Sequence, residues 1–192
     1  MRTKLLSLGG VAIAGGGGLL AGAQTWVSFM LDGTHELVEV TGHAANAALS
    51  PVAIALVAAA LALTIAGPIF RRVLGALVAL LGVGMIALTA NVIASPLGAV
   101  SGRITELTGI AGGASTNMVV WSQLSVWAWV SLAAGVLAVL LGLVIIVLGG
   151  RWVAGGRKYD TAGAAAAPAG GTDRISDWDA LSDGDDPTAD IR

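Results

Sequence analysis

The sequence predicts an all-α integral membrane protein with four transmembrane helices in a small bundle, followed by a disordered acidic C-terminal tail. Hydrophobic residues make up 56% of the 192 residues and charged residues only 11%, whereas soluble proteins carry about 25% charged residues. Four long segments contain no Asp, Glu, Lys, Arg or His, and each is close to the ~20 residues that an α-helix needs to cross a bilayer. These segments are residues 5–23, 51–70, 73–93 and 126–147.

The domain organisation follows from these spans. We expect a four-span membrane domain over residues 1–158, with outer loops at 24–50 and 94–125, and a cytoplasmic tail over residues 159–192. A chain of this length has no room for a separate globular enzyme domain beside four spans. Because cysteine is absent, the chain forms no disulfide, thiolate metal site or cysteine nucleophile.

The basic residues predict the orientation in the membrane. Arg2 and Lys4 precede the first span, Arg71 and Arg72 connect the second and third, and Arg151, Arg157 and Lys158 follow the fourth. The two loops at 24–50 and 94–125 hold one basic residue, Arg103. Since cytoplasmic loops carry an excess of Lys and Arg, we expect a multi-pass protein of the bacterial plasma membrane with both termini in the cytoplasm.

The first span has an alternative interpretation as a cleaved signal peptide. A basic start, an apolar run and the small residues Ala21-Gly22-Ala23 fit that pattern, but the run is longer than the ~7–15 residues of a typical signal peptide. Gly18 and Gly22 have GxxxG spacing, which lets helices approach closely in lipid. We interpret this spacing as packing within the bundle rather than as a dimerisation motif.

The second and third spans are expected to form a tight antiparallel pair. Gly67-Pro68 marks the end of the second span, and Arg71-Arg72 is too short a connector for any other arrangement. Before these spans, residues 36–41 partly alternate between polar and apolar, which predicts a short extended segment that ends at Gly42.

Small residues recur at helical spacing along the third and fourth spans, and we expect both stripes to face other helices. The stripes consist of Gly75, Ala79 and Gly82 in the third span and Gly135, Ala138 and Gly142 in the fourth. The loop at 94–125, with Arg103 and Glu106, has room for a short interfacial helix.

Aromatic residues lie near the predicted ends of the spans. Amphipathic rings commonly anchor a protein at the membrane interface, and we interpret these as such anchors, with a cluster that binds tryptophan or stacks on sugars as the alternative. The outer set is Trp26, Trp121, Trp127 and Trp129, and the inner set is Trp152 and Tyr159.

The most enzyme-like group is His35, Glu36, Glu39 and His43. On one continuous helix His35, Glu39 and His43 would align at four-residue intervals and could ligate zinc. The alternation and Gly42 oppose a helix there, and the HExxH pattern is missing. We therefore expect no catalytic residue, no metal site and no cofactor, and a protein that is not an enzyme.

Transport is a second hypothesis. Coupled carriers usually keep ionisable groups inside the bilayer, and the four spans hold none. The polar candidates in the middle or near the ends of the spans are Thr64, Thr89, Asn91 and Ser131, which we interpret as partners in interhelical hydrogen bonds.

The tail contains one apolar pattern in an otherwise acidic stretch. Ile175, Trp178 and Leu181 would lie on one side of a two-turn helix, before Gly184 and Pro187. Such a helix is too short to be stable alone, and we expect it to dock on a cytoplasmic protein partner. The lipid bilayer is the other expected partner, and nucleic acid is not expected.

Several segments resemble one family. Trp26 after the first span, Val40-Thr41-Gly42 ahead of Pro51 and the Arg71-Arg72 pair are similar to landmarks of the actinobacterial tryptophan-associated transmembrane proteins. The most specific part is the tail. Its segments are Arg151-Trp152, Arg157-Lys158-Tyr159-Asp160 and the stretch from Trp178 to Thr188, where Gly184-Asp185-Asp186-Pro187-Thr188 stands for a Gly-Glu-Asp-Pro-Thr type motif.

The resemblance implies a bacterial inner-membrane protein whose genes lie near those of tryptophan biosynthesis, and it supplies no catalytic residue. We therefore expect an accessory, scaffold or regulatory protein associated with tryptophan biosynthesis. The alternative is a small transporter, or a transporter subunit, for an aromatic amino acid or a precursor.

Overall fold

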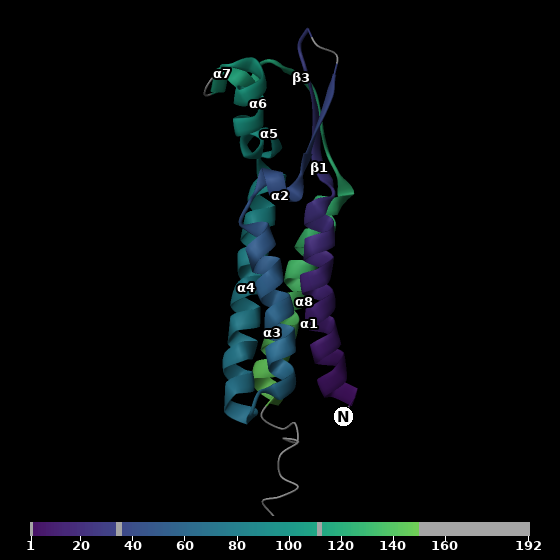
Figure 1. Ribbon diagram of the computed structural model, residues 1–192, viewed down its shortest axis with the longest axis vertical. Helices are drawn as coiled ribbons and strands as arrows, with labels where there is room; N and C mark the ends of the chain where they lie inside the picture. Colours follow the sequence, from purple (N-terminus) through teal and green to yellow (C-terminus); the bar gives the residue numbers. More distant parts are fainter. Residues whose placement is uncertain (1, 34–35, 111–112, 150–192) are drawn as a thin grey trace, which may run out of the picture. The chain divides into compact units, whose positions relative to one another are not determined.

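The computed structural model describes residues 2–33, 36–110 and 113–149 and is mostly helical (Figure 1). Three of its helices are long and apolar enough to cross a membrane: α1 (Arg2–Ala23), α4 (Pro68–Ala94) and α8 (Val126–Leu148). A fourth apolar helix, α3 (Leu49–Ile65), has 17 residues. Helices are thus found within all four predicted spans.

The four long helices lie side by side in a bundle (Figure 1). Helix α1 packs against α3 and α8, and α4 packs against α8 and α3, so each helix has two neighbours in a closed ring. Met85 of α4 is fully buried, and its Cε atom lies over Gly18 of α1 on the inside of this ring. The prediction that spans two and three are neighbours is confirmed by the α3–α4 contact.

The boundary between the second and third spans differs from the prediction. Arg71 and Arg72 do not form the connection, because α3 ends at Ile65, the turn lies at Ala66 and Gly67, and α4 begins at Pro68. Proline has a fixed φ suited to the first helical turn and pushes the residue before it into an extended conformation. Gly67 accordingly has φ −72° and ψ 172°.

The stripes of small residues on α4 and α8 face each other, as predicted. A Cβ atom placed on Gly142 would lie 2.6 Å from the backbone nitrogen of Ala79 and 2.8 Å from the carbonyl oxygen of Gly75. One placed on Gly82 would lie 2.8 Å from the nitrogen of Val139 and 2.9 Å from the oxygen of Gly135. The two backbones are therefore in direct contact along this seam, which we call the α4–α8 seam.

The glycines of the GxxxG pair also serve packing inside the bundle. Gly18 makes room for Met85, and Gly22 makes room for the imidazole of His43. The interpretation of this spacing as intramolecular packing is confirmed.

Large apolar side chains cover the outside of the bundle. Their exposed fractions include 67% for Leu61, 90% for Ile65, 69% for Leu80 and 55% for Leu140. Small residues inside and large apolar residues outside are the arrangement expected where lipid, rather than water, surrounds the helices.

The expectation of an all-α fold is wrong in one respect, because the two long loops contribute a three-stranded antiparallel sheet. Its strands are β1 (Thr25–Leu31), β2 (Leu37–Thr41) and β3 (Val119–Leu124), in the order β2-β1-β3. Strand β2 confirms the predicted extended segment. Strands β1 and β3 were not predicted, and their pairing joins the loop after α1 to the loop before α8.

Short helices complete the region beyond the bundle: α2 (Gly42–Ala45), α5 (Pro96–Ala99), α6 (Ser101–Thr108) and α7 (Gly113–Thr116). Thr41 caps α2, since its Oγ1 accepts a hydrogen bond from the backbone N–H of Ala44 at 3.3 Å. The loop at 94–125, in which the sequence leaves room for a short helix, contains α5, α6 and α7. We call the sheet and these four helices together the outer region.

Trp26 is not an interfacial anchor, contrary to the prediction. Its side chain is 0% exposed, its Nε1–H donates to the carbonyl of Ala21 at 2.8 Å, and its ring lies over Gly42. Buried tryptophan needs a partner for its N–H, and the end of α1 supplies one. Trp121, Trp127 and Trp129 are 44%, 39% and 53% exposed, and their role as interfacial anchors stays a prediction.

Candidate functional site

A cleft of about 440 Å³ in the outer region is the strongest candidate for a functional site. One wall comes from the end of β2 and from α2, with Glu39, Val40, Thr41 and Ala44. The other wall comes from α5, α6 and the residue between them. It is lined by Ala99, Val100, Gly102, Arg103 and Glu106. The cleft therefore brings together the two loops that the sequence places on either side of the α3–α4 pair.

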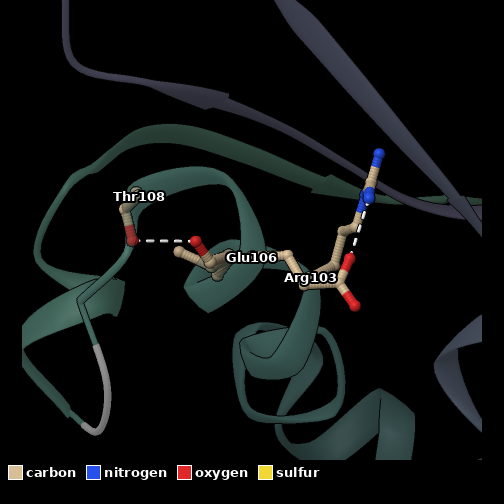
Figure 2. A network of polar contacts seen from close by, with 4 residues as sticks. Arg103, Glu106 and Thr108 are labelled. Atoms are coloured by element: carbon tan, nitrogen blue, oxygen red, sulfur yellow. Dashed lines mark hydrogen bonds and ion pairs between the residues drawn. The ribbon is translucent and has the colours of Figure 1, made fainter.

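The charged side chains of the cleft are two carboxylates and one guanidinium. Arg103 and Glu106 are one helical turn apart on α6 and form an ion pair in which Nη1 lies 2.8 Å from Oε2 (Figure 2). Their side chains are 52% and 67% exposed, so the pair remains open to solvent. Such exposed pairs contribute little to stability, about 0–1 kcal/mol.

Glu39 faces the same cleft from β2. Its Oε2 accepts a hydrogen bond from Thr25 Oγ1 at 3.2 Å, across the β1–β2 pair in which Thr25 lies opposite Thr41. This bond holds the carboxylate at the edge of the sheet. A carboxylate has about four acceptor positions, so Glu39 keeps capacity for another donor.

The C-terminal end of helix α6 and its contact with the core determine where Arg103 and Glu106 lie. Thr108 Oγ1 donates to the carbonyl of Ile104 at 2.8 Å (Figure 2), and Gly109 ends the helix with φ 70°. Ile104 is fully buried and holds the other side of the helix in the core. The charged pair is thereby turned away from the apolar contact.

The residues of the enzyme-like group are divided among different elements. Glu36 is exposed before β2, Glu39 lies on β2, and His43 lies on α2, while His35 lies outside the described residues. The single helix that a zinc site would need is not formed. His43 instead turns its Nε2 toward Gly22, where that atom is buried.

The polar residues of the spans divide into two groups. Thr89 and Ser131 are buried, and their hydroxyls form a hydrogen bond of 3.3 Å across the α4–α8 seam, which confirms the interhelical interpretation for this pair. Thr64 instead donates to the carbonyl of Leu61 in its own helix at 2.6 Å, so the prediction is wrong there. The side chain of Asn91 is exposed.

The predicted docking residues Ile175, Trp178 and Leu181 lie outside the described residues, as do Trp152 and Tyr159. The cleft itself was missed from the sequence. An Arg and a Glu three residues apart were noticeable in the loop at 94–125, but no local signal links them to Glu39.

The fold and its surfaces define the class of the protein. Long apolar helices, small residues at their contacts and large apolar residues outside are features of an integral membrane protein with a helical bundle. Comparison with family models gives the family. Residues 8–188 match the model of the tryptophan-associated transmembrane proteins, and the chain belongs to that family. No significant match was found among curated proteins or among solved structures.

Proposed function

We propose that the chain is a four-span plasma-membrane protein without enzymatic activity, with an accessory or regulatory role associated with tryptophan biosynthesis. The family name links it to tryptophan. The observation that carries the regulatory role is the combination of a tightly packed helical bundle with a charged cleft beyond its end. The bundle supplies the membrane anchor, and the outer region supplies a recognition surface.

The proposal treats α3 as the fourth span. Its 17 residues would extend over about 25 Å at 1.5 Å per residue, which is within the shorter range of membrane helices, about 17–25 residues. The contacts of α3 with α1 and α4 support this, because they place it inside the same ring as the three longer helices.

The orientation is supported by the charges. The start of α1, the α3–α4 turn and the end of α8 lie at one end of the bundle (Figure 1), and Arg71 Cβ lies 3.5 Å from a Cβ placed on Gly149. Arg2, Lys4, Arg71 and Arg72 belong to that end. The positive-inside rule assigns it to the cytoplasm and the outer region to the opposite side.

Cysteine labelling tests this topology, since the chain has no native cysteine. Asp32, Ser122 and Gly67 are exposed, and each would be changed singly to Cys and probed on intact cells with a membrane-impermeant maleimide. We expect labelling at 32 and 122, and labelling at 67 only after the cells are opened. Labelling of position 67 on intact cells would refute the orientation.

The α4–α8 seam argues against the alternative of a transporter. At Gly82, Gly135 and Gly142 even one added carbon would lie under 3.0 Å from an atom of the neighbouring helix, so this interface has no space for a solute. The α4 and α8 segments at 73–94 and 126–148 also contain no ionisable side chain. A coupled carrier would be expected to keep one.

Partner capture tests the regulatory role. The full chain would be crosslinked in native membranes and purified beside a Trp178→Ala variant, because we propose that Ile175, Trp178 and Leu181 dock on a cytoplasmic protein. We expect that protein to be recovered with the wild-type chain and lost with the variant. Tryptophan uptake into vesicles that depends on the protein, together with unchanged capture, would favour the transporter instead.

A further inference from the structure

We propose that the cleft of the outer region binds a zwitterionic α-amino acid with an apolar side chain. This inference rests on the proposed regulatory role. Binding of the amino acid in the outer region would be the signal to which the protein responds. The ligand class follows from the charges, the size and the lining of the cleft.

The charges fit both ends of an amino acid. Glu39 on β2 and Glu106 on α6 offer carboxylate oxygens to an ammonium group, and Arg103 offers N–H donors to a carboxylate. The ion pair with Glu106 engages Arg103 through Nη1, and a guanidinium has five N–H donors in a planar fork suited to carboxylates. Arg103 can therefore pair with Glu106 and with a ligand carboxylate together.

A ligand with one charge fits less well. An anion would approach a cleft with two carboxylates and one guanidinium, whose sum is −1, and like charges disfavour it. A simple cation would satisfy the carboxylates but would bring no acceptor to Arg103. A zwitterion pairs with both signs and adds no net charge to the site.

The other residues that line the cleft are mostly apolar, and they favour a ligand with an apolar side chain. Val40 and Val100 line the cleft and are 5% and 2% exposed, and the lining also includes the small apolar residues Ala44 and Ala99. Small residues leave room for a larger group from the ligand. The volume of about 440 Å³ lies within the range of small-molecule sites, about 300–1,000 Å³.

Titration calorimetry on the full chain in lipid nanodiscs tests the proposal. L-tryptophan and L-leucine are the zwitterionic probes, tryptamine lacks the carboxylate, and indole-3-propionate lacks the ammonium group. We expect saturable binding of at least one of the two amino acids. Binding of tryptamine or indole-3-propionate should be at least tenfold weaker than binding of L-tryptophan if L-tryptophan is the ligand.

Variants assign the binding to the cleft. Glu39→Gln and Arg103→Gln should each weaken binding about tenfold or more, while Glu36→Gln, an exposed carboxylate that does not line the cleft, should leave it within twofold. A double variant with Arg103→Glu and Glu106→Arg keeps an ion pair on α6 but exchanges the two charges. It should fold, as circular dichroism would show, and should lose binding.

Several results would overturn the proposal. They are absence of binding for both amino acids, equal binding of tryptamine and L-tryptophan, and unchanged affinity in both the Glu39→Gln and Arg103→Gln variants. Failure of the proposed function would be seen separately, since partner capture through Trp178 does not require the cleft. If neither amino acid binds but the cytoplasmic partner is still recovered with the wild-type chain, this inference is rejected and the proposed function is not.

Discussion

Replacing Gly142 by alanine should push α4 and α8 apart. The new methyl group would lie 2.6 Å from the backbone nitrogen of Ala79, 2.8 Å from its Cβ and 2.8 Å from the carbonyl oxygen of Gly75. Contacts shorter than 3.0 Å to backbone atoms cannot be relieved by a side-chain rotation, so the helices must separate. Overpacking of this kind costs about 1–3 kcal/mol, and a gap of 0.5–1 Å between packed surfaces loses about a quarter to a half of each dispersion contact.

A matched control is available on the same helix pair. Gly84 of α4 has open space where a Cβ would be placed, so Gly84→Ala adds the same methyl group without a clash. Alanine is also the better helix former by about 1 kcal/mol in aqueous hosts. We expect Gly84→Ala to be neutral or stabilising, while Gly142→Ala lowers the free energy of unfolding by about 1–3 kcal/mol.

Unfolding by sodium dodecyl sulfate in mixed micelles, followed by the circular dichroism of the helices, measures the difference. Gly142→Ala should unfold at a lower detergent mole fraction than the wild type. Equal midpoints for Gly142→Ala and the wild type would refute the seam as described. A loss of stability in Gly84→Ala as large as that in Gly142→Ala would refute the assignment of the effect to the clash.

Two further predictions concern other contacts of the bundle and the outer region. Trp26→Ala removes a fully buried ring and its bond to Ala21, and it should cost about 3–5 kcal/mol. Hydrogen exchange of the β1 amides should then become much faster, and unchanged exchange would contradict the role of this ring. Thr89→Val removes the hydrogen bond to Ser131 at nearly constant volume and should cost only about 0.6 kcal/mol, the average for such bonds in a membrane bundle. The same detergent titration measures it, and a loss above about 2 kcal/mol would show that the hydroxyl pair does more than one ordinary hydrogen bond.

The helices were predictable because their signals are local. A long segment without charged residues is unfavourable in water, so its length predicts a membrane span. Small residues at helical spacing mark a face that the backbone of another helix can approach. The error was at the connection between α3 and α4. The charges of Arg71 and Arg72 predict a connecting loop, whereas Arg71 is 2% exposed within the first turn of α4. The conformational preference of Gly67-Pro68 sets the boundary instead.

The sheet was only partly predictable because the sequence of its central strand shows no regular alternation of polar and apolar residues. Strand β1 is covered by β2 on one edge and β3 on the other, and its residues are buried or half-buried throughout. Burial alternates from Val27 to Leu31, but the half-buried positions include the apolar Met30 beside the polar Ser28, so the sequence gives no clear period of two. Strand β2 has exposed residues, Leu37 and Glu39 among them, and its polar–apolar pattern was visible for that reason.

The position of Glu39 in the cleft depends on contacts that no periodicity can show. The ring of Trp26 lies over Gly42 at the start of α2, and the imidazole of His43 lies over Gly22 near the end of α1. These two contacts join the end of the first span, the central strand and the short helix that follows β2. Glu39 precedes that helix by three residues, so its carboxylate is placed by the end of α1 as well as by its own strand. A tryptophan that the sequence assigns to the lipid interface is therefore one of the residues that hold the wall of the candidate site in place.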